Sequence, residues 1–206
     1  MLLAAAAGCQ KGPDPEVVAQ HRQRLMMDDE PDGILTVIEL REAFTGTSSE
    51  PEAGAVEVTE TSESTEQPSA DEPASPTTPE GPVVIVGRVG GLTNPWQETR
   101  PEYPFVPGEA AFFLADAGAV AENEASGHVH APGEECPFCA AHAGDNSAML
   151  AMIRFKQDGK PITIEATDLL DLKPLDTVVV RGEASFTGDA ETGMLVVEAD
   201  GIYIRR

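Results

Sequence analysis

The segment Gly46–Gly81 constrains this chain most, because it divides the sequence into two unequal parts. It is dominated by Ser, Thr, Glu, Pro and Ala, it contains no Lys or Arg, and its only large apolar residues are Val56 and Val58. Such a segment cannot bury enough apolar surface to offset the entropy that is lost on ordering. We therefore expect a disordered acidic linker that acts as a flexible tether between an N-terminal segment, 9–45, and a main domain, 82–206.

The charge of the chain limits its partners. The sequence has 36 acidic and 13 basic residues, a net charge of −23, and residues 82–206 alone carry −10. Phosphate binding needs clustered Lys and Arg, so this balance argues against a nucleic-acid partner. No apolar run reaches the roughly 18–20 residues of a membrane-spanning helix, so none is predicted. A docking role of the linker toward a basic partner stays open.

From residue 82 onward the chain reads as a series of strands. Apolar runs end in glycine or in turn residues, which is typical of β structure. A shorter apolar stretch at 162–164 is a candidate additional strand. Thr167 is the expected cap of a helical turn that ends near Leu172. The predicted main strands are 83–91, 110–116, 148–155, 177–184 and 194–204.

The order of these elements resembles the OB-fold. Three strands precede an irregular or helical connection and two strands follow it, and the first strand carries glycines that allow sharp coiling. Two short segments, Val86-Gly87-Arg88-Val89 and Val180-Arg181-Gly182, are similar to segments that recur in exported proteins of this fold. The resemblance implies a mainly β protein with a five-stranded OB-like barrel. An SH3-like barrel or a small sandwich is the alternative.

The N-terminal segment carries weaker signals. Asp14 stands before Pro15 as a helix N-cap does, and the following residues suit a short helix that ends before Gly33. Residues 34–40 form an apolar run that reads as a strand or as a helix. The segment is too small to fold alone, so we expect it to pack on the main domain.

The first nine residues, Met1 to Cys9, resemble the end of a bacterial lipoprotein signal peptide. Small residues precede the cysteine, although Ala6 stands where the lipoprotein motif usually has Leu and no basic region comes first. The resemblance implies that residues 1–8 are removed and that Cys9 carries a lipid. The protein would then be anchored to a membrane in the bacterial cell envelope. The alternative is an apolar stub with an unmodified cysteine.

One cluster concentrates the reactive side chains of the chain. The loop 127–142 holds three of the four His and two of the three Cys. Thiolate and imidazole together suit zinc or copper, and a Cys-x-x-Cys spacing lets two sulfurs bind one ion. The predicted ligands come from His128, His130, Cys136, Cys139 and His142.

Other uses of this cluster remain open. Cys136 and Cys139 could form a disulfide or a thiol redox pair, although a thioredoxin-like site normally opens a helix in a βαβ unit. Haem attachment needs Cys-x-x-Cys-His, whereas Ala140 follows Cys139 here. The histidines could also be idle. Five candidate ligands favour a closed, structural metal site over a catalytic one. The neighbouring Glu134 and Glu135 are read as solvated acids.

Aromatic residues suggest a possible binding surface. Trp96, Tyr103 and Phe105 lie in a proline-rich loop after the first strand. Phe112 and Phe113 are adjacent on the second strand, so they point to opposite faces and one of them must leave the barrel core. The loop aromatics are expected to cover a barrel mouth or to contact a protein partner. Base stacking, the usual role of OB-fold aromatics, conflicts with the negative charge.

These features predict a binding or metal-handling protein more than an enzyme. The favoured function is an envelope-anchored, OB-like binding protein with a zinc or copper site in the loop 127–142. A thiol redox or copper-delivery protein is the second possibility. A plain binding module for a ligand or a nucleic acid, stapled by a structural metal or a disulfide, is the third.

Overall fold

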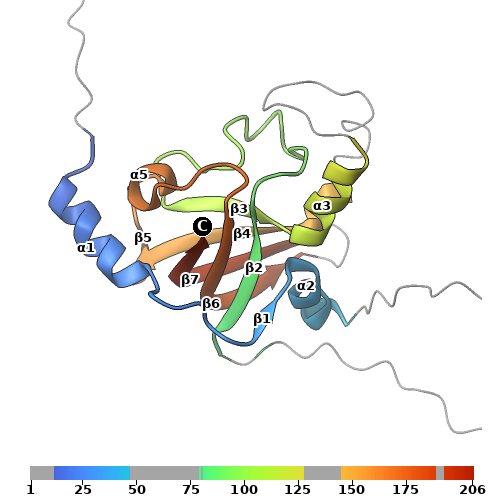
Figure 1. The fold of residues 1–206 in the computed structure, drawn as a ribbon, viewed down its shortest axis with the longest axis horizontal. Helices are drawn as coiled ribbons and strands as arrows, with labels where there is room; N and C mark the ends of the chain where they lie inside the picture. The colour runs from blue at the N-terminus through green and yellow to red at the C-terminus, as the bar shows by residue number, and fades with distance from the viewer. Residues whose placement is uncertain (1–11, 47–78, 80, 128–144, 189–192) are drawn as a thin grey trace, which may run out of the picture.

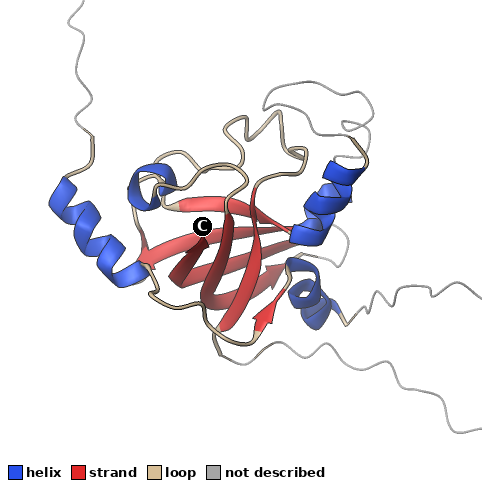
Figure 2. Cartoon of the chain, in the orientation of Figure 1, coloured by secondary structure: helices blue, strands red, loops and turns tan. Residues whose placement is uncertain are grey.

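The computed structural model describes residues 12–46, 79, 81–127, 145–188 and 193–206. Within these ranges the chain folds into one curved sheet with helices around it (Figures 1 and 2). No helix among the described residues is long and apolar enough to cross a membrane.

Five strands close the barrel. They pair in the order β2-β3-β4-β7-β6, and β6 pairs with β2 to complete the ring. All neighbours are antiparallel except β4 and β7, which run parallel. This is the mainly β, OB-like architecture that the order of the predicted strands indicates. The barrel strands are β2 (Val83–Val89), β3 (Ala111–Ala115), β4 (Leu150–Gln157), β6 (Thr177–Thr187) and β7 (Met194–Arg205).

Alternating side chains of these strands fill the barrel. In β2, residues 83, 85, 87 and 89 are buried and the residues between them are half-buried, as a strand with one inward face requires. Phe112 and Phe155 contact each other in the core, with their ring centroids 6.4 Å apart. Ile85, Ile153, Val180 and Ile202 join them, each with no exposed surface. The interior is thus an apolar core built from all five strands.

The N-terminal segment belongs to the same folded body. It forms α1 (Pro15–Leu25), β1 (Ile34–Leu35) and α2 (Val37–Thr45). Asp14 caps α1 as predicted, accepting a hydrogen bond from the Glu16 N–H. Strand β1 pairs in parallel with β2. Leu25, Val37 and Leu40 are buried in the barrel core.

This packing shows what the two ends of the linker are attached to. Residue 46 ends α2 against the barrel, and β2 begins at Val83 beside β1. Residues 47–78 and 80 lie outside the described residues, but both flanks of the segment lie on one body. The segment therefore connects two parts of one folded body, and the prediction that the N-terminal segment packs on the main domain is confirmed.

Four smaller elements differ from the prediction. The short additional strand is β5 (Lys160–Pro161), not 162–164, because the buried Ile162 instead exchanges backbone hydrogen bonds with Ala110 and Phe155. Helix α5 (Ala166–Leu170) begins after Glu165, so Thr167 lies inside it and is not its cap. Helix α3 (Ala117–Ala125), which starts directly after β3, and the 3-10 turn η1 (Asp145–Met149) were not predicted.

Candidate functional site

The predicted site residues fall into two groups. Cys9 and the candidate metal ligands (His128, His130, Cys136, Cys139 and His142) lie outside the described residues. The loop aromatics Trp96, Tyr103 and Phe105 are described, and all three belong to the connection between β2 and β3. Elsewhere in the described part of the chain, no three His, Cys, Asp or Glu side chains gather as metal ligands would.

The structure defines the base from which the candidate metal loop leaves the barrel. Asp116 follows β3, is 3% exposed, and caps α3 by accepting hydrogen bonds from the Gly118 and Ala119 N–H groups at 2.9 and 3.2 Å. Its other carboxylate oxygen accepts from the Ile38 N–H of α2 at 3.3 Å. On the return side, the Met149 carbonyl accepts from the Asp116 N–H. One buried carboxylate therefore joins β3, α3 and α2.

A second core cluster connects this base to the aromatic loop. It lies outside the barrel core and is made of Leu92, Ala115, Val120 and Leu150. Trp96, Tyr103 and Met149 pack against it. The Asn146 side chain of η1 also donates a hydrogen bond to the Thr93 carbonyl, with nitrogen and oxygen 3.1 Å apart. The loop after β2 and the base of the metal loop therefore share one packed cluster.

The aromatic loop folds over the outer face of β3. Phe113 points away from the barrel, opposite to Phe112, yet only 1% of it is exposed. Trp96 and Tyr103 cover it, with ring centroids 4.9 and 5.6 Å from the Phe113 ring. All three predicted surface aromatics are therefore engaged in packing. Trp96 and Tyr103 cover the outer face of β3, and Phe105 packs partly buried against the barrel core.

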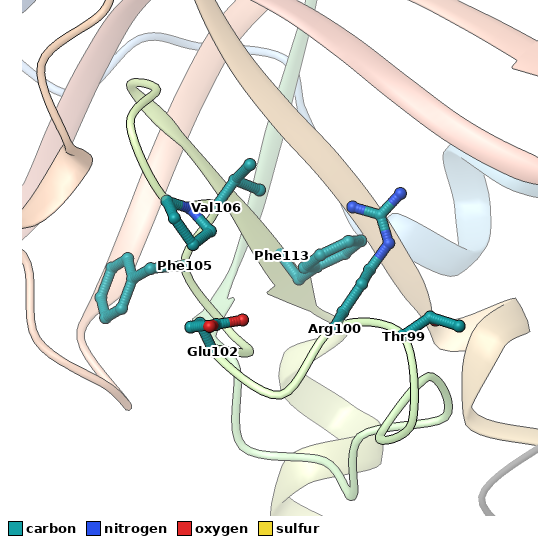
Figure 3. A pocket seen from close by; sticks show the side chains of 7 residues that line it. Thr99, Arg100, Glu102, Phe105, Val106 and Phe113 are labelled. Atoms are coloured by element: carbon teal, nitrogen blue, oxygen red, sulfur yellow. The ribbon is translucent and has the colours of Figure 1, made fainter.

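A pocket of about 300 Å³ remains beside this cluster (Figure 3). Phe113 forms part of its lining, and Phe105, the third predicted aromatic, lines another side. The Arg100 guanidinium lies over the Phe113 ring, 5.5 Å from its centroid. In the view of Figure 3, Glu102 lies between Phe105 and Arg100. The complete lining is Thr99, Arg100, Glu102, Phe105, Val106, Pro107 and Phe113.

Sequence reasoning missed the polar half of this pocket. Arg100 and Glu102 lie in the predicted loop, but nothing in their spacing marks them as neighbours of Phe113. The available signal was the Phe112-Phe113 pair, since one of these rings had to be covered by another part of the chain. The loop aromatics were the residues able to cover it.

The buried phenol of Tyr103 gives a pH-dependent prediction. Burial raises its pKa well above the ordinary value, and its hydroxyl lies near the Leu92 backbone without a well-formed hydrogen bond. The unfolded chain releases this proton near pH 10, so the phenol lowers the free energy of unfolding as the pH rises above about 10. We expect Tyr103→Phe to remove this contribution, so the free energy of unfolding of the variant should fall less above that pH.

Urea unfolding midpoints at about pH 9 and about pH 11 measure this effect. The wild-type midpoint should fall more over this range than the Tyr103→Phe midpoint. Tyr203→Phe, which changes the other tyrosine of the chain, is the control and should fall like the wild type. Equal declines in wild type and Tyr103→Phe would show that the phenol is not held protonated by burial.

No protein-family model, curated protein or solved structure matches this chain.

Proposed function

We propose that this chain is a binding protein whose OB-like barrel carries a metal ion in the loop 127–142. Zinc is the favoured ion and copper the alternative. The ligands are drawn from His128, His130, Cys136, Cys139 and His142. The role of the ion is to fix the loop for metal-dependent binding or to be handled as cargo, and not to catalyse a reaction.

The observation that carries this proposal is that the Cys and His side chains lie in one loop, whereas the barrel interior is apolar. Five thiol and imidazole side chains fall within the loop 127–142. The described parts of the chain hold no comparable group, and the barrel interior is filled by apolar side chains. Outside this loop the sequence has only Cys9 and His21 of these residue types, so such ligands are concentrated in the loop. Four such ligands satisfy the tetrahedral preference of zinc.

The base of the loop supports the same proposal. The α3 flank is held by Asp116, and the η1 flank is held by the bond from Asn146 to Thr93. A metal that closes the loop would act between two anchored flanks. Less chain entropy would therefore be lost on metal binding than in a loop whose ends were free. The second core cluster lies under both flanks and under the aromatic loop. Trp96 and Tyr103, which pack on this cluster, also contact Phe113 of the pocket in Figure 3.

Zinc binding by the reduced full-length chain tests this proposal. We expect one zinc per chain, and we expect Cys136→Ser and Cys139→Ser each to weaken zinc binding by at least about tenfold, because each removes one thiolate ligand. The measurement is a competition titration against a chromogenic zinc chelator, repeated with copper(I). If the ion closes the loop, zinc should also raise the melting temperature.

The chain supplies matched controls for this titration. Cys9→Ser removes the third cysteine, and His21→Ala removes the fourth histidine, which lies on α1. Both variants should bind zinc like the wild type. If the wild type binds no zinc, or if the Cys9 and Cys136 variants lose affinity equally, the loop is not the metal site.

The envelope location is part of the same proposal. Cys9 lies six residues before α1, and α1 packs on the barrel through α5 and β7. A lipid on Cys9 would therefore hold the barrel close to the membrane. Metabolic labelling with a fatty acid should mark the wild type and not Cys9→Ser. Labelling of both, or of neither, would contradict lipidation at this residue.

A further inference from the structure

We propose that the pocket beside β3 binds the carboxyl-terminal aromatic residue of a peptide or protein. The ring would lie against Phe105 and Val106, next to the buried Phe113, the carboxylate would pair with Arg100, and the backbone N–H would donate to Glu102. This site lies in the described barrel and not in the metal loop, so its test is independent of metal binding.

The aromatic part of the pocket provides the first argument. Phe113 faces outward from a rigid barrel strand but is only 1% exposed, because Trp96 and Tyr103 cover it, so it forms a buried edge of the pocket. Phe105, Val106 and Pro107 add further apolar lining. Planar rings pack well in offset or edge-to-face contact with such surfaces. A volume of about 300 Å³ is at the lower limit for small-ligand pockets, which suits one side chain and not a large cofactor.

The charge of Arg100 provides the second argument. In this acidic chain, most of the described arginines of the barrel are paired with carboxylates: Arg88 with Glu124, Arg154 with Glu109, Arg181 with Asp200 and Arg205 with Glu30. Arg100 has no such partner within the described residues; its guanidinium lies over Phe113. A guanidinium beside an aromatic surface fits a carboxylate attached close to a ring, because it can bind both oxygens.

Glu102 narrows the choice of ligand. Its negative charge lies beside the positive charge of Arg100 and disfavours dianionic ligands such as a phosphate ester, because like charges repel. The same carboxylate accepts a hydrogen bond from an N–H group. A ligand with one carboxylate, one neighbouring N–H and an aromatic ring meets all three requirements. The last residue of a chain that ends in Phe or Tyr has this chemistry.

Small probes test each requirement separately. We expect N-acetyl-phenylalanine to bind the full-length protein with a Kd on the order of 1 mM, which is reasonable for a ligand of this size. N-acetyl-phenylalaninamide lacks the carboxylate and should bind at least about tenfold more weakly. N-acetylglycine lacks the ring and should not bind at the same concentrations. Fluorescence of Trp96, the single tryptophan of the chain, reports binding, and saturation-transfer NMR on the probes confirms it.

Two arginine variants complete the test. In Arg100→Gln, the Kd of the acid should rise to that of the amide. The matched control is Arg24→Gln on α1, because Arg24 is exposed and forms no ion pair with the described residues. It should bind the acid like the wild type, and circular dichroism verifies that both variants are folded.

Several results would overturn the proposal. These are no binding of the acid at about ten times the expected Kd, equal binding of acid and amide, or an Arg100→Gln variant that binds like the wild type. Tighter binding of phenyl phosphate would show that the pocket prefers a dianion. Tighter binding of free phenylalanine would assign the site to the amino acid and not to a chain end.

Discussion

Replacing Leu40 with alanine should lower the free energy of unfolding by about 2–5 kcal/mol, the usual cost of truncating a fully buried leucine. Leu40 lies on α2 and has no exposed surface. It packs in the same core as the barrel strands, together with Leu25 and Val37. Because α2 comes from the N-terminal segment, the loss would show that the barrel depends on residues far from it in sequence.

Val17→Ala is the control for this variant. Val17 lies on α1 and is 41% exposed, so its truncation should change stability by less than about 0.5 kcal/mol. The measurement is urea unfolding followed by circular dichroism. The same argument predicts that a fragment of residues 82–206 unfolds at a lower urea concentration than the full chain. Equal stability of Leu40→Ala and Val17→Ala would mean that α2 does not complete the core.

Gly182→Ala should destabilise the barrel by about 3 kcal/mol, at the upper end of the range for overpacking. A Cβ atom at residue 182 would lie 2.4 Å from the Glu198 carbonyl oxygen and 2.7 Å from the Ala199 Cα. Both obstacles are backbone atoms, so no side chain can rotate away. The position is also a β-bulge. The β6–β7 register passes from Arg181–Gly201 to Gly182–Ala199, so Asp200 has no partner residue in the strand pairing.

Gly12→Ala is the matched control, because a Cβ at residue 12 would meet no atom within 4 Å. Gly87→Ala should behave like Gly182→Ala, since its Cβ would lie 2.4 Å from the Ala115 carbonyl oxygen. Melting temperatures of the three variants compare them directly. If Gly182→Ala and Gly12→Ala melt together, the close strand contact at the bulge is not required.

These two glycines explain why the barrel could be predicted from the sequence. Gly87 and Gly182 lie in the two short segments that indicated an OB-like barrel, Val86-Gly87-Arg88-Val89 and Val180-Arg181-Gly182. Each glycine allows two strands to approach more closely than a Cβ would permit. The strand runs around them are strongly apolar and have clear ends. The apolar strand pattern and the close strand contacts of the barrel therefore both favour glycine at these two positions.

The N-terminal segment shows what the apolar pattern alone could not resolve. The run 34–40 was compatible with a strand or with a helix, and the structure contains both. The boundary is Thr36, whose hydroxyl accepts a hydrogen bond from the Glu39 N–H while the Glu39 carboxylate accepts from the Thr36 N–H. This capping box is a sequence signal that periodicity does not include. The docking of the segment is a tertiary effect that depends on the completed barrel.

For the candidate metal site the sequence offers only the ligand chemistry, which stays a prediction because residues 128–144 lie outside the described residues. Cysteine and histidine types at close spacing indicate zinc or copper without any fold. The pocket required the structure, because it arises where residues 99–107 fold back over Phe113. No local pattern places Arg100 over that ring, since the contact depends on the path of the whole loop.

The most direct test of the proposed function is native mass spectrometry of the full-length chain, purified without added metal and without an affinity tag. One experiment reports both the bound ion and the oxidation state of Cys136 and Cys139. We predict one zinc or copper per chain, with both thiols reduced, and no metal in Cys136→Ser. A metal-free chain that carries a Cys136–Cys139 disulfide would contradict the proposal and identify the loop as a covalent staple.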